Sequence, residues 1–150
     1  MSKPAKRIDI ITLKTVKERS ILYPERKVSC PEKAAELIRP FLEDSDREMF
    51  MVLYMNTKNE PVGLHTVSIG TINAALVSPP EVFKAALLSN AASLIVFHNH
   101  PSGHTQPSKE DMNITKRLTE AGQLLGIHVT DHIIIGDAGK YYSFKEENQM

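Results

Sequence analysis

The chain has 150 residues, of which 41% are hydrophobic and 24% are charged, a composition typical of one soluble globular domain. Its 18 basic and 18 acidic residues cancel, which argues against a general electrostatic attraction to nucleic acid or to an anionic membrane. Cys30 is the only cysteine, so an internal disulfide and cysteine-based zinc sites are excluded. Because no stretch resembles a signal peptide or a membrane span, we expect a cytoplasmic protein without membrane contacts.

Residues 1–30 are predicted to form a basic N-terminal arm or strand within the same folding unit as the rest of the chain. They hold eight lysines and arginines against three acidic residues. Residues 8–16 are rich in β-branched side chains and predict a strand. The basic residues fit contact with nucleic acid, or a solvated strand edge that lysines protect from pairing, and the second interpretation is favoured.

Hydrophobic periodicity, with proline and glycine at the boundaries, predicts the elements that follow. Helices are expected over residues 31–42, 79–90 and 108–125. Strands are expected over residues 48–55, 62–69, 93–97, 127–135 and 141–144. This order predicts an α/β fold, a mixed sheet flanked by helices, in a domain of residues 31–145 with a frayed tail at 146–150.

Two histidines and an aspartate form the most informative pattern in the chain. His98 and His100 follow the apolar segment 94–97, and residues two apart at the end of a strand point to the same side. Asp111 lies in the first turn of the next predicted helix. Two imidazoles and one carboxylate suit zinc and leave a fourth position for water. The same ligands also suit iron or manganese.

Ser108 and Asp111 also fit a purely structural role. Ser-x-x-Asp at the start of a helix is a variant of the capping box, in which side chains satisfy the unpaired backbone donors of the first turn. The capping role of Ser108 and a metal-binding role of Asp111 are compatible, because a carboxylate anchored in a first turn is also well oriented.

The spacing His98-x-His100, then Ser108-x-x-Asp111, matches the JAMM motif of the JAB/MPN metalloprotease superfamily. Further strings of this sequence resemble the RadC branch of that superfamily. They are His-Asn-His-Pro-Ser-Gly, Asp131-His132-Ile133-Ile134-Ile135-Gly136, Gly70-Thr71 and Glu81-Val82-Phe83. The resemblance covers roughly residues 30–145 and implies a cytidine-deaminase-like JAB/MPN architecture. One departure is His104, where RadC-like proteins usually carry an acidic residue.

The resemblance implies roles for five residues. His98, His100 and Asp111 would bind one zinc ion per chain, and an upstream glutamate would hold the water molecule that attacks the substrate. Glu48 fits that glutamate because it opens an apolar strand, whereas Glu43 and Glu60 lie in polar turns. Without the resemblance, Glu48 would be interpreted as a solvated strand-edge residue. Ser108 would help to hold the oxyanion. His132 is left as either a neighbour of the metal ligands or a core histidine.

The expected function is therefore a zinc-dependent hydrolase that cleaves a peptide or isopeptide bond through a metal-activated water. Its partner would be a protein or peptide substrate, and the chain is a candidate homodimer. One alternative is a module associated with DNA repair or recombination that binds DNA or protein without protease activity, although no basic helix supports it. Another is a non-catalytic scaffold, which the intact motif argues against.

Overall fold

A computed structural model describes residues 2–70 and 77–150. Thr71, part of one string in the resemblance, lies outside these residues. In the two described ranges, no helix has the length and apolar character that crossing a bilayer requires.

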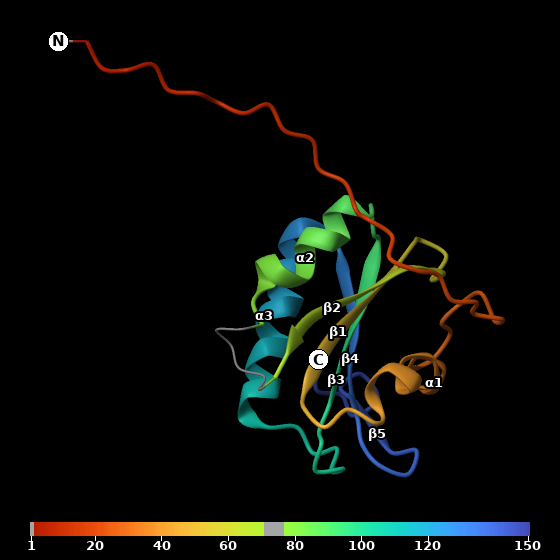
Figure 1. Cartoon of the computed structure of the whole chain (residues 1–150). Coiled ribbons are helices and arrows are strands. Elements are labelled where there is room, and N and C mark those ends of the chain that lie inside the picture. Colours follow the sequence, from red (N-terminus) through yellow and green to blue (C-terminus); the bar gives the residue numbers. More distant parts are fainter. Residues whose placement is uncertain (1, 71–76) are drawn as a thin grey trace.

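Within the described ranges, five strands form one mixed sheet (Figure 1). In the sheet order β2-β1-β3-β4-β5, β1 is antiparallel to both β2 and β3, β3 is parallel to β4, and β5 is antiparallel to β4. Their bounds are β1 Met49–Met55, β2 Pro61–Ile69, β3 Ser93–Asn99, β4 His128–Ile135 and β5 Tyr141–Ser143. The expected α/β fold with a mixed sheet is confirmed.

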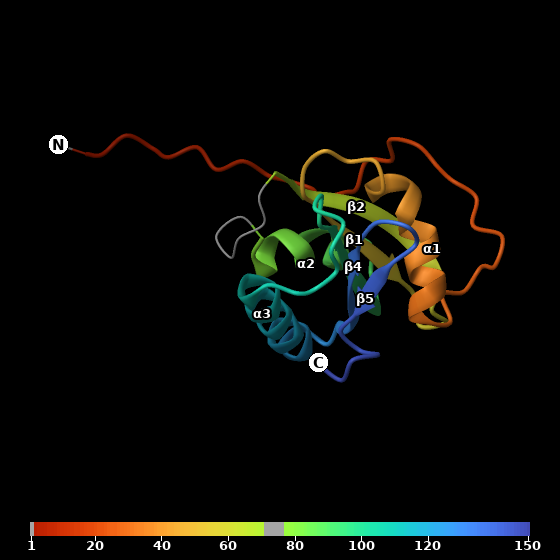
Figure 2. The same ribbon diagram turned by 90° about the horizontal axis from the view of Figure 1, so that it is seen from below.

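Helices cover both faces of the sheet (Figure 2). Helix α1 (Pro31–Leu42) packs on one face, where Ile38 joins Phe97 in an apolar cluster. Helices α2 (Pro79–Leu88) and α3 (Lys109–Leu125) pack on the other face, where Leu118 joins Val96 in a second cluster. Because side chains alternate along a strand, the even-numbered residues of β3 face α2 and α3. His98 therefore continues the row of Leu94 and Val96 toward α3.

Strand β3 is two residues longer than the sequence predicts. Its pairing with β4 continues through His98 and Asn99, and its pairing with β1 continues to His98. His98 is therefore held by both neighbouring strands and Asn99 by β4, which the low strand propensity of these polar residues did not indicate.

The strand predicted over residues 8–16 is wrong. This stretch forms neither helix nor strand, and Ile10 is 99% exposed. Figure 1 shows the red N-terminal arm running away from the sheet. Strand propensity stabilises a strand only when a neighbouring strand pairs with it.

The C-terminal residues 146–150 are exposed, and part of their backbone is hydrogen-bonded. The backbone N–H of Glu147 donates to the carbonyl of Ser143, and that of Gln149 donates to the carbonyl of Phe144. These bonds close a turn against the end of β5, so the tail has partners that its polar composition did not indicate.

Two leucines test which part of the chain carries the stability. Leu118 is 0% exposed on α3, whereas Leu13 is 70% exposed in the N-terminal arm. We expect Leu118→Ala to lower the free energy of unfolding by about 2–5 kcal/mol through a buried cavity. Leu13→Ala should change it by less than about 0.5 kcal/mol. Urea denaturation measures both, and equal losses would show that the arm packs on the domain.

Candidate metal centre

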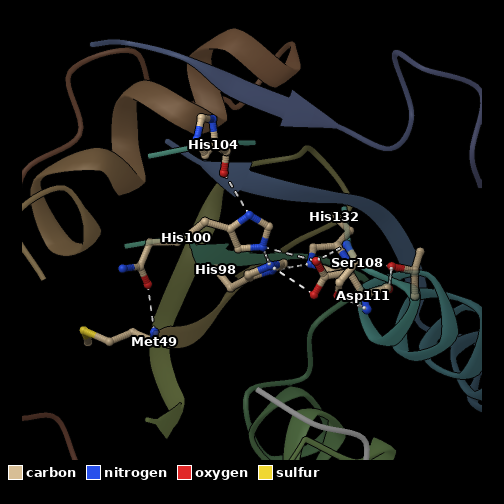
Figure 3. A network of polar contacts seen from close by, with 9 residues as sticks. Met49, His98, His100, His104, Ser108, Asp111 and His132 are labelled. Atoms are coloured by element: carbon tan, nitrogen blue, oxygen red, sulfur yellow. Dashed lines mark hydrogen bonds and ion pairs between the residues drawn. The ribbon is translucent and has the colours of Figure 1, made fainter. Parts of the chain in front are cut away.

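Three side chains converge where β3 ends and α3 begins (Figure 3). The Nε2 atoms of His98 and His100 are 3.0 Å apart. The Asp111 carboxylate lies 3.2 Å from each of them, with Oδ1 facing His98 and Oδ2 facing His100. The structure thus brings together the predicted ligands, and each of the three offers one atom to a group that can hold a metal ion.

The end of the sheet positions both imidazoles. His98 is paired within the sheet, opposite Phe50 of β1 and Ile134 of β4, and its side chain is buried. His100 follows β3 directly, and its backbone N–H donates to the carbonyl of Ile135 at 3.1 Å. The extended path of the chain therefore continues past the last strand residue, which keeps the two rings on one side.

A capping box positions the carboxylate. The Asp111 N–H donates to Ser108 Oγ at 3.1 Å, and the Ser108 N–H donates to Asp111 Oδ2 at 2.8 Å. The structural interpretation of this pair is confirmed, and it is compatible with metal binding because Oδ1 remains directed at His98. Ser108 Oγ accepts a hydrogen bond here, so its own hydroxyl hydrogen is available to donate elsewhere.

The protonation of His100 follows from one contact. Its Nδ1 lies 2.9 Å from the carbonyl oxygen of His104. Because a carbonyl only accepts, Nδ1 must carry the hydrogen, and in the neutral ring Nε2 then presents a lone pair to the Asp111 carboxylate. Two acceptors that face each other at this distance repel unless a proton or a metal ion lies between them. This donor set fits a divalent metal ion.

The pKa values of the site show the same attraction for positive charge. Burial alone would lower the pKa of His100, but the hydrogen bonds to Asp111 and to the His104 carbonyl raise it above its ordinary value. Burial would raise the pKa of Asp111, but the two imidazoles of His100 and His98 beside it hold it well below its usual range. The carboxylate is therefore ionised, and the site favours a positive charge among its three ligand side chains.

Two glycines hold the loop that supplies the His104 carbonyl. Gly103 has a φ of +86°, which residues that carry a side chain rarely adopt. Its carbonyl accepts a hydrogen bond from the Asp137 N–H at 3.1 Å. A Cβ on Gly136 would collide with the Gly103 carbonyl oxygen. The loop is therefore packed against the turn between β4 and β5. The imidazole of His104 points away from the three ligands in Figure 3.

Arg39 of α1 fixes that turn from the other face of the sheet. Its guanidinium donates to the carbonyl oxygens of Gly136 and Lys140, both at 3.0 Å. The backbone that supports His100 is consequently connected to a helix on the opposite face of the sheet. No motif in the sequence pointed to this link.

Glu48 lies directly before β1, half-buried, and its carbonyl accepts the Gly70 N–H at 2.7 Å. Its negative charge is one of the influences that raise the pKa of His100, so the carboxylate lies within electrostatic reach of that ring. The rejected candidate Glu60 contacts Asn56 in the turn that follows β1, which is the opposite end of that strand.

Asn99 lies between the two histidines in the sequence, and its side chain bonds the backbone of the residues before and after Glu48. Its Oδ1 accepts from the Met49 N–H at 2.8 Å, and its Nδ2 donates to the Arg47 carbonyl at 3.0 Å. One buried amide therefore holds the residues on both sides of Glu48 against the end of β3. Sequence reasoning missed this role, although a polar residue enclosed by two candidate ligands and next to an apolar run is a usable signal.

His132 contacts His98, so it is a neighbour of the predicted metal ligands as well as a buried histidine. Its Nε2 is 2.8 Å from His98 Nδ1, and the ring is fully buried. Burial is the main reason that the pKa of His132 lies well below its ordinary value. The adjacent Asp131 has a different task, since it accepts hydrogen bonds from the Ser143 hydroxyl and the Lys145 N–H.

Comparison with known proteins agrees with this geometry. The family model described as RadC-like JAB domain matches residues 28–149. UPF0758 proteins of Methanosarcina mazei, Desulforamulus reducens and Listeria monocytogenes are 48%, 51% and 50% identical over 130, 120 and 120 residues. These alignments cover 87%, 80% and 80% of this chain and 56%, 52% and 53% of the relatives.

The chain thus spans about half the length of the curated relatives it matches, and their names state no activity. Because the family match extends over most of the sequence and includes all three ligands of the site, the chain belongs to the RadC-like JAB domain family.

Proposed function

We propose that this chain is a zinc-dependent hydrolase of the JAMM type that cleaves a peptide or isopeptide bond. The observation that carries the proposal is the convergence of His98 Nε2, His100 Nε2 and the Asp111 carboxylate within hydrogen-bonding distance of one another. When bound by three protein ligands, zinc makes a water molecule acidic near neutral pH and polarises a carbonyl group.

Glu48 is the proposed general base. Its carboxylate accepts a proton from the attacking water and then delivers it to the leaving nitrogen, so that one group serves both halves of the reaction. Two observations support the assignment. The charge of Glu48 reaches His100, and Asn99 holds the backbone on both sides of it.

Ser108 is the proposed oxyanion donor. Its side chain sits at the N-terminus of α3, where the helix dipole favours negative charge. The Asp111 N–H occupies one lone pair of Ser108 Oγ, which leaves the hydroxyl hydrogen for the oxygen of the substrate carbonyl as it becomes negative.

Metal content tests the centre directly. We expect the purified protein to bind one zinc ion per chain, and His100→Ala to lose it because only two ligands remain. His65→Ala is the matched control, since His65 is exposed on β2. Elemental analysis by mass spectrometry after dialysis against zinc gives the stoichiometry. A wild-type protein that retains no zinc would refute the metal centre.

Glu48→Gln tests the base. We expect this variant to keep its zinc and to lose hydrolysis by about 10²–10⁴-fold, because the amide cannot accept the proton of water. The measurement incubates zinc-loaded protein with proteome-derived peptides, including lysine-branched ones, and counts new termini by mass spectrometry. Glu43→Gln is the control because Glu43 is exposed after α1.

Full cleavage by Glu48→Gln would contradict the assignment of the base. Wild-type protein that leaves all peptides intact but nicks DNA in a metal-dependent way would instead support the DNA-associated alternative.

Asn99→Leu tests whether Glu48 must be held in place. The isosteric leucine removes both hydrogen bonds around Glu48 and leaves the Met49 N–H and the Arg47 carbonyl without this partner. We expect zinc binding within a few-fold of wild type and hydrolysis lowered by about 10-fold or more, since small misplacements of a catalytic group are costly. Zinc content and peptide cleavage are measured together. Loss of both in parallel would assign Asn99 to the metal ligands instead.

A further inference from the structure

Two buried polar side chains beside the metal centre have no part in the proposed reaction. His132 of β4 is 0% exposed and Thr115 of α3 is 3% exposed. His132 meets the Nδ1 side of the His98 ring, whereas His100 meets its Nε2 side (Figure 3). Buried polar groups require partners, so their contacts indicate what they do.

These two residues connect one metal ligand to another. His98 Nδ1 lies 2.8 Å from His132 Nε2, and His132 Nδ1 lies 2.5 Å from Thr115 Oγ1. Thr115 Oγ1 then lies 2.7 Å from the backbone carbonyl oxygen of Asp111. The row of hydrogen bonds thus starts at the imidazole of one ligand and ends at the backbone of another.

The carbonyl at its end sets the direction of the whole row. A carbonyl only accepts, so the Thr115 hydroxyl donates to Asp111 and must accept from His132 Nδ1–H. In the neutral ring of His132, Nε2 is then the acceptor, and it receives the Nδ1–H of His98. His98 therefore carries its hydrogen on Nδ1, and its Nε2 presents a lone pair to the metal centre.

The opposite direction would disable the ligand. If the Thr115 hydroxyl donated to His132 Nδ1, then His132 Nε2–H would donate to His98 Nδ1. His98 would carry its hydrogen on Nε2, directed at the Asp111 carboxylate, with no lone pair for a metal. This arrangement gains a contact of His98 Nε2–H with Asp111 Oδ1 at 3.2 Å but forfeits the shorter 2.7 Å bond from Thr115 to the Asp111 carbonyl, and the shorter bond favours the first direction.

We propose that His132 and Thr115 are positioning residues that fix His98 in the tautomer whose Nε2 can bind metal. The inference rests on the proposed metal centre. It adds how the tautomer of one ligand, His98, is set before a metal ion binds. A hydrogen bond to the second ring nitrogen commonly sets the tautomer and orientation of a metal-binding histidine. Here that partner is a second histidine, whose own tautomer is set by a threonine.

Aromatic packing holds the imidazole rings of His98 and His132 in place. Phe144 stacks on His132 with ring centroids 4.6 Å apart and planes inclined by 5°. Phe50 meets the edge of His132 at 5.9 Å and stacks parallel to His98 at 6.2 Å. The two imidazoles are enclosed by apolar rings, so the tautomer is set by protein groups rather than by bulk water.

Thr115→Val and Thr115→Ser form a matched pair of variants for the test. Valine keeps the shape and removes the hydroxyl, whereas serine keeps the hydroxyl. In metal-free protein with ¹⁵N-labelled histidine at pH 8, long-range ¹H–¹⁵N spectra report which nitrogen of His98 carries hydrogen. We expect the Nδ1–H form in wild type and Thr115→Ser, and a mixture of both forms in Thr115→Val.

Zinc affinity provides the second readout. Competition with a chelator should show a Kd for Thr115→Val that is about 10–100-fold weaker than that of wild type, the usual cost of losing a group behind a ligand. Thr115→Ser should restore wild-type affinity. A residue that only filled space would tolerate valine, because valine and threonine have nearly the same volume.

Two results would overturn the proposal: an Nε2–H form of His98 in metal-free wild type, or a folded Thr115→Val with unchanged tautomer and unchanged Kd. The wild-type spectrum requires no variant to fold, so the test stands even if Thr115→Val is unstable. Neither readout depends on hydrolysis. Failure to cleave peptides would count against the proposed reaction, whereas failure of wild type to bind zinc would count against the metal centre.

Discussion

The organising interaction of this domain is the repulsion among groups that all offer lone pairs to one point. The hydrogen bond from His100 Nδ1 to the His104 carbonyl leaves Nε2 of the neutral ring without a hydrogen, facing the ionised Asp111. Such a cluster is costly in a folded protein unless a cation occupies it. The capping box, the extended end of β3 and the loop at Gly103 all hold the cluster together against that repulsion. Their combined effect is a site prepared for a positive charge.

Each ligand depends on a different level of the fold. The alternation of side chains along β3 directs His98 toward α3, and the sheet pairing that continues to residue 99 makes that direction rigid. The first turn of α3 supplies Asp111, whose carboxylate both caps the helix and faces the imidazoles. A site built in this way lies at the junction of a parallel βαβ unit, where the strand ends and the crossover helix begins.

The sequence predicted the ligand set and most of the fold because these rest on local signals. The spacing of His98, His100 and Asp111 is readable directly, and Pro31, Pro79 and Gly126 mark helix boundaries. The strand expected over residues 8–16 failed because pairing is a non-local property that composition does not encode. Asn99, Arg39 and the His132 contact escaped for the same reason, since each acts on backbone or side chains more than 30 positions away.

The bridge from Arg39 to the turn after β4 has a wider implication for how this domain tolerates change. Helix α1 lies across the sheet from the imidazoles. Its residue Arg39 nevertheless donates hydrogen bonds to the turn that is itself hydrogen-bonded to the Gly103 loop. The position of that distant helix is thereby coupled to the candidate metal centre through two backbone carbonyl groups. Arg39, which offers no atom to the three-residue group, is in this way coupled to the backbone that supports His100.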